Sequence, residues 1–343
     1  MRTRPALALA TALMTTFAIT ACGGSGGGSS AQSSGGGDED TVTVAFVPKL
    51  QGSPYFEAMN TGAEQAVADL GNIEWLYQGP TTADAAAQAD VVRAFIQQQV
   101  DVLIVAPNDP DSLTPLLQEA QAAGIRVATS DTDAPNSVRE AFVNQADADA
   151  IGKQVMDSLV AAMGDTGEYA IVSCGETAEN LNSWIEAETT YAESTYPGLE
   201  QVDLGYSGED QAANAQMATD FMNAHPNLKG LIGQCTSSAA GVAQAVRDAG
   251  AIGDVFSVGV GTPQSMKPYL EDGSSSASVL WDVEQFGYLT AWAGLQLGQD
   301  VPFEATNDVS EALPAVEYDE ASKQLLLGPA LEITLDNVDD FDY

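Results

Sequence analysis

Residues 42–56 read Val-Thr-Val-Ala-Phe-Val-Pro-Lys-Leu-Gln-Gly-Ser-Pro-Tyr-Phe, and this stretch decides the fold. Its apolar, β-branched beginning predicts a buried parallel strand. A turn rich in proline, glycine and serine follows, after which Phe56, Met59, Ala63 and Val67 recur at helical spacing. A strand that enters a helix through such a turn is the first unit of an open α/β sheet. In such sheets ligands bind outside the carboxyl ends of the strands.

Strands and helices alternate along the rest of the chain. We predict strands at 73–77, 102–105, 125–129 and 140–143, then at 169–174, 201–204, 228–234 and 255–258, and helices at 83–98, 111–123, 146–163, 178–196, 211–224 and 238–249. Two such runs predict an α/β protein with two doubly wound parallel-sheet lobes. Residues 41–343 are enough for two lobes with separate cores.

The first 40 residues indicate export. A basic start and a short apolar stretch predict a secretory signal over residues 1–21. Residues 19–22, Ile-Thr-Ala-Cys, resemble a bacterial lipobox and make Cys22 the expected lipid attachment residue. The alternative is an ordinary signal peptide with an incidental cysteine. Residues 22–40 are mostly glycine, serine and acidic residues, which predicts a flexible tether and an extracytoplasmic protein lipid-anchored to the cell membrane.

The charge of the chain limits its partners. There are 49 acidic residues against 11 lysines and arginines, and the formal net charge is -38. A nucleic acid needs a basic footprint, so it is excluded as a partner. Membrane contact is expected only through the lipid anchor. We interpret the acid excess as a strongly solvated surface.

The sequence contains no arrangement of residues typical of an enzyme active site. His225 is the only histidine, and it precedes Pro226 in a predicted helix-to-strand loop, far from the strand ends. A Ser-His-Asp or Cys-His arrangement is therefore not possible. No metal-ligand spacing occurs, and the glycine-rich stretches lie in the tether, where they would cradle no phosphate. We predict no enzymatic activity, no metal and no cofactor.

Polar and aromatic side chains gather where the predicted strands end. Carboxylates accept hydrogen bonds from paired hydroxyls, amides donate and accept, and aromatic faces pack on C–H surfaces, so this mixture suits a neutral polyhydroxylated ligand. For any single Asp or Asn the alternative is helix capping. Asp111 fits a cap, whereas Asp109 and Asp131 stand directly at strand ends.

Six motifs occur in one order along the chain. They are Phe-Val-Pro-Lys-Leu at 46–50, Tyr-Gln-Gly-Pro-Thr at 77–81, Asn-Asp-Pro-Asp-Ser-Leu at 108–113, Ser-Asp-Thr-Asp at 130–133, Val-Asn-Gln at 143–145 and Leu-Trp-Asp-Val at 280–283. With them the chain from Thr41 onward resembles the ribose-binding-like periplasmic sugar-binding proteins of ABC importers. Within these it most resembles the branch of the rhamnose-binding and autoinducer-2-binding proteins.

This resemblance implies the type I periplasmic binding protein fold, with two lobes joined by a three-strand hinge and a ligand clamped between them. The N-terminal lobe would be 41–145 plus 283–314 and the C-terminal lobe 146–282 plus 315–343, with crossings near Gln145, near Asp282 and within 314–318. The residues implied to line the first lobe are Lys49, Phe56, Asp109, Asp131 and Asn144. Those implied for the second lobe and hinge are Asn180, Asn182, Trp184, Thr236, Trp281 and Asp282.

Two departures from the family pattern bear on the ligand. Autoinducer-2 binders carry Asp-Gln where this chain has Asn180-Leu181, and Pro-x-Ala where it has Gln234-Cys235-Thr236. The form Asn-x-Asn-x-Trp at 180–184 is nearer to the rhamnose binders, although those have Gln at the position of Leu181.

The resemblance and the rim residues together predict a monomeric substrate-binding lipoprotein of an ABC importer, which delivers a neutral monosaccharide or polyol to its permease. Lys49 would be the one cation of the site, against the four carboxylates of Asp109, Asp131, Asp133 and Asp282. This excess of negative charge disfavours an anionic ligand. One alternative is a lipoprotein that presents its ligand, including autoinducer-2-like signals, to a membrane sensor or chemoreceptor. A lectin-like or enzymatic exported protein is a third.

Cys174 and Cys235 stand at the carboxyl ends of the first and third predicted strands of the second lobe. In the strand order 2-1-3-4-5 these strands are neighbours, about 4.8 Å apart, within reach of a disulfide. A disulfide between them is one possibility in an oxidising compartment, and it would fix the pocket floor beside Asn180 and Thr236. Two buried free thiols are the other.

Overall fold

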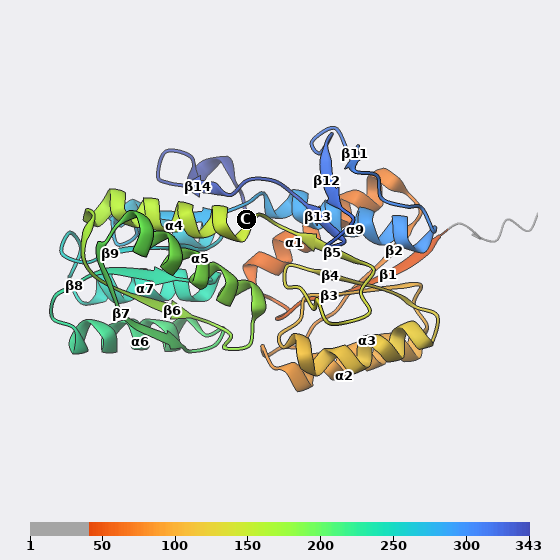
Figure 1. Ribbon diagram of the computed structural model, residues 1–343, viewed down its shortest axis with the longest axis horizontal. Coiled ribbons are helices and arrows are strands. Elements are labelled where there is room, and N and C mark those ends of the chain that lie inside the picture. The colour runs from red at the N-terminus through yellow and green to blue at the C-terminus, as the bar shows by residue number, and fades with distance from the viewer. Residues whose placement is uncertain (1–40) are drawn as a thin grey trace, which may run out of the picture. The chain divides into compact units, whose positions relative to one another are not determined.

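The computed structural model describes residues 41–343 (Figure 1). The predicted signal peptide 1–21, the tether 22–40 and the lipid attachment residue Cys22 lie outside the described residues. None of the helices in residues 41–343 combines the length and apolar character that crossing a membrane requires.

The first lobe is built on an eight-stranded sheet with the strand order β11-β12-β13-β5-β4-β3-β1-β2. Strands β1 to β5 and β13 run parallel, while β12 is antiparallel to both of its neighbours, β11 and β13. The strands are β1 (Val42–Val47), β2 (Ile73–Tyr77), β3 (Val102–Val105), β4 (Arg126–Ser130), β5 (Ala141–Asn144), β11 (Thr306–Asn307), β12 (Val316–Asp319) and β13 (Gln324–Leu326).

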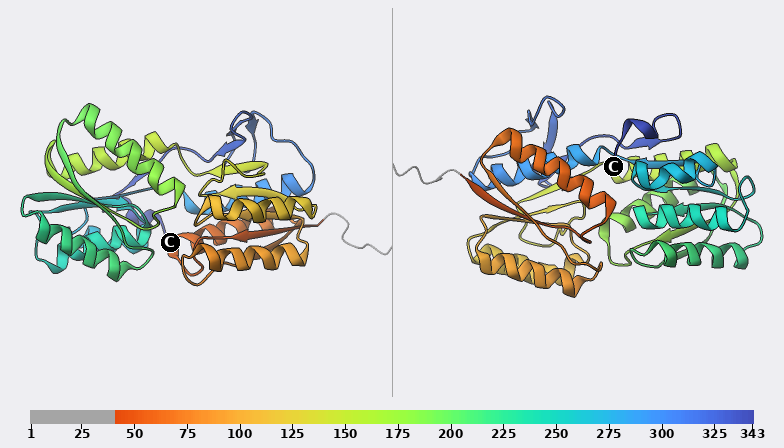
Figure 2. Two further views of the ribbon diagram at one scale, coloured as in Figure 1. Left: turned by 60° about the horizontal axis from the view of Figure 1, so that its bottom comes forward. Right: turned by 180° about the vertical axis from the view of Figure 1, so that it is seen from behind.

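Helices cover both faces of this sheet, as Figure 2 shows. They are α1 (Pro54–Leu70) and α9 (Val283–Gly298) on one face and α2 (Ala85–Gln98) and α3 (Pro110–Ala122) on the other. Strands β1 and β3 are buried on both faces, which is why their sequences are almost continuously apolar.

The second lobe is built on a six-stranded sheet with the order β14-β10-β9-β8-β6-β7, parallel except for β14. Its strands are β6 (Thr166–Ser173), β7 (Gly198–Tyr206), β8 (Leu228–Gly233), β9 (Phe256–Val260), β10 (Ala277–Leu280) and β14 (Leu331–Ile333). The helices are α4 (Ala148–Met163), α5 (Glu179–Thr195), α6 (Gln211–Ala224), α7 (Thr236–Asp248), α8 (Pro263–Asp272) and the short 3-10 helix η1 (Val338–Asp340).

Both sheets contain the parallel strand order 2-1-3-4-5, which confirms the predicted fold class of two doubly wound lobes. The predicted strands and helices agree with the observed ones to within a few residues. The largest difference is β7, which spans Gly198–Tyr206, whereas the prediction was 201–204.

In the described chain the connections between the sheets lie after β5, after β10 and between β13 and β14. The first lies between Asn144 and Ala148, and the second between Leu280 and Val283. The third lies later than 314/315, because β12 and β13 pair into the first sheet next to β5. Residues 316–326 therefore belong to the first lobe, and only β14 and the residues after it lie with the second sheet. The hairpin β12–β13 was not predicted from the sequence.

Helices α1 and α9 touch backbone to backbone. A Cβ atom at Gly62 would clash with the Glu284 carbonyl, and one at Gly287 with the Met59 carbonyl. Only glycine permits this approach, which fixes α1 against α9.

Candidate functional site

A pocket lies at the carboxyl ends of the strands of both sheets, where both lobes contribute side chains. Its cavity volume is about 40 Å³, well below the roughly 300–1,000 Å³ typical of small-molecule sites, so the two lobes close tightly around it in this structure. The lining residues are Lys49, Ser53, Tyr55, Phe56, Asp131, Asn180, Leu181, Trp184, Glu209, Gln234, Cys235, Thr236, Val260, Leu280 and Trp281.

Asp131 is the centre of the polar part of this pocket. It follows β4 directly and is only 3% exposed. Its carboxylate lies 3.1 Å from Lys49 Nζ and accepts hydrogen bonds from the Tyr55 hydroxyl at 3.0 Å and from Thr132 Oγ1 at 3.2 Å. Lys49 Nζ also donates to Asn180 Oδ1 of the second lobe at 2.9 Å. The charges of Lys49 and Asp131 thus largely compensate each other inside the protein.

The backbone of Asp131 is strained. Its φ angle is 67°, in the left-handed region that is uncommon for residues other than glycine. Aspartate and asparagine tolerate this region better than most residues, and such strain often accompanies functional positions. The conformation belongs to the turn that places the carboxylate beside Lys49 and Tyr55.

Aromatic rings form the apolar wall of the pocket. The centroid of the Tyr55 ring lies 5.0 Å from that of Phe56 and 5.8 Å from that of Trp281, and the rings of Trp184 and Trp281 are 5.6 Å apart. All three pairs pack edge to face, the arrangement that aromatic quadrupoles favour. Helix α1 supplies two of these rings, the end of β10 supplies Trp281 and α5 supplies Trp184. This wall offers flat surfaces on which the C–H face of a sugar ring can pack.

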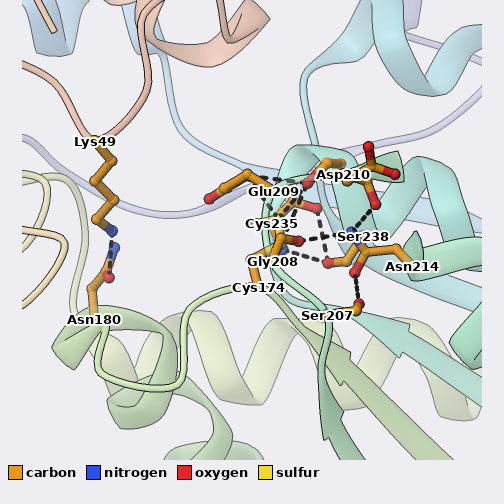
Figure 3. The surroundings of a disulfide bond; sticks show 11 residues. Lys49, Cys174, Asn180, Ser207, Gly208, Glu209, Asp210, Asn214, Cys235 and Ser238 are labelled. Atoms are coloured by element: carbon orange, nitrogen blue, oxygen red, sulfur yellow. Dashed lines mark hydrogen bonds between the residues drawn. A yellow bond between two sulfur atoms is a disulfide. The ribbon is translucent and has the colours of Figure 1, made fainter. Parts of the chain in front are cut away.

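Across the pocket lie Glu209 and a disulfide between Cys174 and Cys235, with Cα atoms 6.3 Å apart (Figure 3). Cys174 follows β6, and Cys235 precedes the first residue of α7. Ser237 Oγ donates to Glu209 Oε2 at 3.1 Å. Burial raises the pKa of Glu209, while the nearby Lys49 and the hydrogen bond from Ser237 act in the opposite direction.

The pocket brings together most of the residues expected from the sequence. Those that line it are Lys49, Phe56, Asp131, Asn180, Trp184, Thr236 and Trp281. They come from five separate parts of the chain. The carboxyl ends of the strands thus supply side chains to this pocket from both lobes.

Two expected carboxylates lie outside the pocket lining, and both are helix caps. Asp109 accepts a hydrogen bond from Ser112 N at 2.9 Å at the start of α3. Asp282 accepts one from Gln285 N at 3.0 Å at the start of α9. The capping alternative therefore describes Asp109, whereas Asp111, which was expected to be the cap, lies in the first turn of α3.

Two expected asparagines also lie outside the pocket lining. Asn182 belongs to a separate groove, where its amide donates to the Glu176 carbonyl and accepts from the Tyr206 hydroxyl. It lies two residues after Asn180 on α5, which turns its side chain away from the pocket. Asn144 ends β5, and its backbone carbonyl accepts from Leu327 N at the hinge.

Asp133, expected to face the pocket, is paired elsewhere. It accepts from Arg139 Nη2 at 2.7 Å and from Thr129 Oγ1 at 2.8 Å, and both carboxylate and guanidinium are buried. The carboxylates that do face the pocket are those of Asp131 and Glu209, with Lys49 as the cation.

Several pocket residues were not among the expected ligand-binding residues, although Cys235 was expected at the pocket floor as half of a possible disulfide. They are Ser53, Tyr55, Leu181, Glu209, Gln234, Cys235, Val260 and Leu280. Glu209 was missed because β7 continues to Tyr206, so that residues 207–210 are the strand-end loop. With β7 ending at Tyr206, the expectation that binding residues follow the ends of strands also points to Glu209. Val260 and Leu280 are the last residues of apolar strands, and no sequence signal separates them from the core.

Two doubly wound lobes with a small polar and aromatic pocket between them define a binding protein that encloses a solute. The chain belongs to the periplasmic binding protein family, since the family model described as "Periplasmic binding protein domain" matches residues 44–300. This is a family of solute-binding proteins and not of enzymes, which confirms the predicted binding function and the resemblance to the ribose-binding-like type.

Among characterised relatives, the chain is 29% identical over 264 residues to the D-ribose/D-allose-binding protein of Pseudomonas aeruginosa, covering 74% of this chain and 80% of the relative. An ABC transporter solute-binding protein from Clostridium phytofermentas, solved with bound L-rhamnose, superposes with a TM-score of 0.81 at 27% identity, covering 88% of this chain and 98% of that one. LsrB from Clostridium saccharobutylicum in complex with AI-2 gives 0.82 at 26% identity, covering 88% of this chain and all of that chain (100%).

Proposed function

We propose that the protein is the substrate-binding lipoprotein of an ABC importer and clamps a neutral monosaccharide or polyol between its lobes for delivery to the permease. One observation carries the proposal. Lys49, Asp131 and Asn180 form a buried polar cluster drawn from both lobes, beside a wall of aromatic rings. The relatives named after D-ribose and D-allose and the neighbour with bound L-rhamnose support a sugar as the ligand.

The pocket chemistry supports a neutral ligand. Asp131 and Asn180 supply acceptors for hydroxyl groups, while Lys49 and the Asn180 amide supply donors. Since Lys49 is already paired with Asp131, the carboxylate of Glu209 would meet an anionic ligand without a compensating cation. A sugar of five or six carbons fits this distribution of charge.

Ligand binding in this arrangement would favour closure of the two lobes. Lys49 belongs to the first lobe and Asn180 to the second, so a sugar that bonds to both groups is held only when they lie close together. A permease would then distinguish the closed, loaded form from the open one. Anchoring through Cys22 would keep the protein at the membrane surface where that permease lies.

A thermal-shift screen tests this function. The panel contains L-rhamnose, D-ribose, D-allose, D-arabinose and xylitol as neutral compounds, with a sugar acid and a sugar phosphate of matched size as anions. We expect at least one neutral compound to raise the unfolding temperature and Asp131→Ala to abolish the rise. Binding of the anions alone would overturn the neutral-ligand assignment, and no shift with any compound would overturn the sugar-binding function.

Presentation of a signal molecule to a membrane sensor is a second candidate, favoured by the similarity to a protein solved with AI-2. Leu181 and Gln234 differ from the residues of autoinducer-2 binders at these pocket positions. Including autoinducer-2 in the panel separates the candidates. Stabilisation by autoinducer-2 and by no neutral sugar would replace the importer proposal by this one.

A further inference from the structure

A buried carboxyl group lies directly behind the pocket wall. Glu188 of α5 is 0% exposed. Among residues 41–343 its one side-chain hydrogen-bond partner is Gln234, whose Nε2 donates to Glu188 Oε2 at 2.5 Å. The other carboxyl oxygen, Oε1, has no partner among these residues. The Glu188 carboxyl group is therefore tied to the pocket through a single side chain.

Gln234 connects this carboxyl group to the pocket. It comes immediately after β8, its backbone N–H donates to the Val172 carbonyl at 3.0 Å, and it lines the pocket. The side chain is 0% exposed, and its Oε1 has no hydrogen-bond partner in the part of the chain that the structure describes. A buried amide carbonyl left unpaired is costly, so an acceptor at this position calls for a donor from a bound molecule.

The surroundings of Glu188 keep its carboxyl group neutral. Burial raises the pKa of Glu188 to about 8, and the hydrogen bond from Gln234 opposes this shift only in part. In the described chain no lysine, arginine or histidine forms an ion pair with it. An ionised carboxylate without a partner is strongly unfavourable in such a place. Glu188 thus fixes the Gln234 amide without adding a charge to the pocket.

We propose that Gln234 is a specificity-determining residue whose side-chain carbonyl accepts a hydrogen bond from a hydroxyl of the bound sugar, and that Glu188 is the positioning residue that holds its amide in place. The inference rests on the proposed sugar-binding function. It goes beyond the Lys49–Asp131–Asn180 cluster by assigning a further contact to the second lobe. A carbonyl fixed in this way requires a donor hydroxyl and selects against a sugar that lacks it, because the buried acceptor would then stay unpaired.

The test is a double-mutant cycle measured by calorimetry. L-rhamnose, D-ribose and D-arabinose are titrated into the wild type, and the tightest binder of the three is used with the variants. Gln234→Leu removes the acceptor with little change in shape, and we expect binding at least about 10-fold weaker. Glu188→Leu should weaken binding by a similar factor, and the double variant should be no weaker than either single one.

Two further variants separate positioning from a merely structural role. Glu188→Gln keeps a neutral acceptor for the Gln234 amide, so its affinity should stay within about threefold of the wild type. Ser158→Ala is the folding control, since Ser158 is buried in the same lobe, donates to Glu332 Oε1 at 2.5 Å and lies outside the pocket. It should leave the affinity unchanged.

Each outcome bears on one assignment. If Gln234→Leu binds the sugar like the wild type, Gln234 is not a ligand contact. If Glu188→Leu and Gln234→Leu weaken binding additively, or if Glu188→Gln fails to preserve it, the positioning role of Glu188 is overturned while the contact by Gln234 stands. If none of the three sugars binds to the wild type, while all variants remain folded, the sugar-binding function falls and this assignment with it.

Discussion

Lys49 and Asn180 form a hydrogen bond between the two lobes, 2.9 Å from Nζ to Oδ1, although 131 positions separate them in the sequence. The same Lys49 Nζ lies 3.1 Å from an oxygen of Asp131. One ammonium group thus serves the ion pair inside the first lobe and the contact to the second lobe. The first prediction concerns this group.

Lys49→Met should weaken both binding and folding. The side chain is 6% exposed and its partner Asp131 is 3% exposed, so its removal leaves a carboxylate buried without its cation. We expect a loss of about 3 kcal/mol in the free energy of unfolding, measured by urea titration, and no detectable sugar binding by calorimetry. Lys153→Met is the matched control, because Lys153 pairs with Asp157 in an exposed setting and its loss should leave the free energy of unfolding nearly unchanged. Equal losses for the two variants would contradict the assignment.

Asp131→Ala and Asn182→Ala should differ sharply in ligand binding. Asp131 lines the pocket, and Asn182 lies in a separate groove with its amide already paired. We expect Asp131→Ala to cost at least about 2 kcal/mol of binding free energy, as for a ligand hydroxyl left without its buried partner. Asn182→Ala should bind like the wild type. If calorimetry shows the reverse order, the pocket does not hold the ligand in the arrangement described here.

The stability of the protein should fall as the pH rises from 4.5 to 8, in part because of Glu188. Its pKa is raised to about 8 in the folded state, from an ordinary value of 4.5. The folded state therefore holds a proton that the unfolded state releases, and stability present below pH 4.5 is lost up to about pH 8. The loss is on the order of 4 kcal/mol. Glu188→Gln should remove this dependence, so that the variant gains stability relative to the wild type as the pH rises.

Urea unfolding at pH 5, 6.5 and 8.5 measures this difference. The control is Glu186→Gln, which changes an exposed residue of the same helix and should give a curve parallel to that of the wild type. A constant difference between Glu188→Gln and the wild type at all three pH values would mean that Glu188 is ionised in the folded protein.

Counting thiols decides the state of Cys174 and Cys235 in the purified protein. The chain has three cysteines, so the measurement uses the Cys22→Ser variant, denatured with and without reductant. We expect no free thiol before reduction and two afterwards. The disulfide closes a loop with a sequence separation of 61, which by chain entropy corresponds to about 4 kcal/mol. Two thiols without reductant would favour the alternative of buried free cysteines.

Strand ends were predictable because they depend on local patterns. The apolar run of β1 and the turn after it predict Lys49 and Phe56 at the end of the first sheet, and the same reasoning predicts Asp131 and Asn180 at strand ends; all four line the pocket. Side-chain direction was not predictable in this way. Asp109 and Asp131 both follow strands, yet Asp109 caps α3, and Asp131 takes a left-handed backbone conformation that turns it towards Lys49. The sequence pattern around the two aspartates does not distinguish these conformations.

Contacts between segments far apart in the chain were the second feature that could not be predicted from the sequence. The hairpin β12–β13 joins the first sheet beside β5, more than 170 residues away in the chain, and its short strands carry little apolar pattern. Glu188 was predicted only as part of a helix, because its burial depends on how α5 packs against α4 and on the position of Gln234 after β8. The close approach of Gly152 on α4 to the backbone of Glu188 has no signature in the local sequence.

The contact between α1 and α9 also determines where the molecule can bend. Helix α1 begins at the pocket with Tyr55 and Phe56, and α9 begins immediately after the second connection between the lobes. Since their backbones meet at Gly62 and Gly287, the two helices can rotate only together, as one rigid body with the first sheet. We therefore expect any opening of the pocket to change backbone torsion angles in the short links 145–147, 281–282 and 327–330, while the interior of the first lobe keeps its shape.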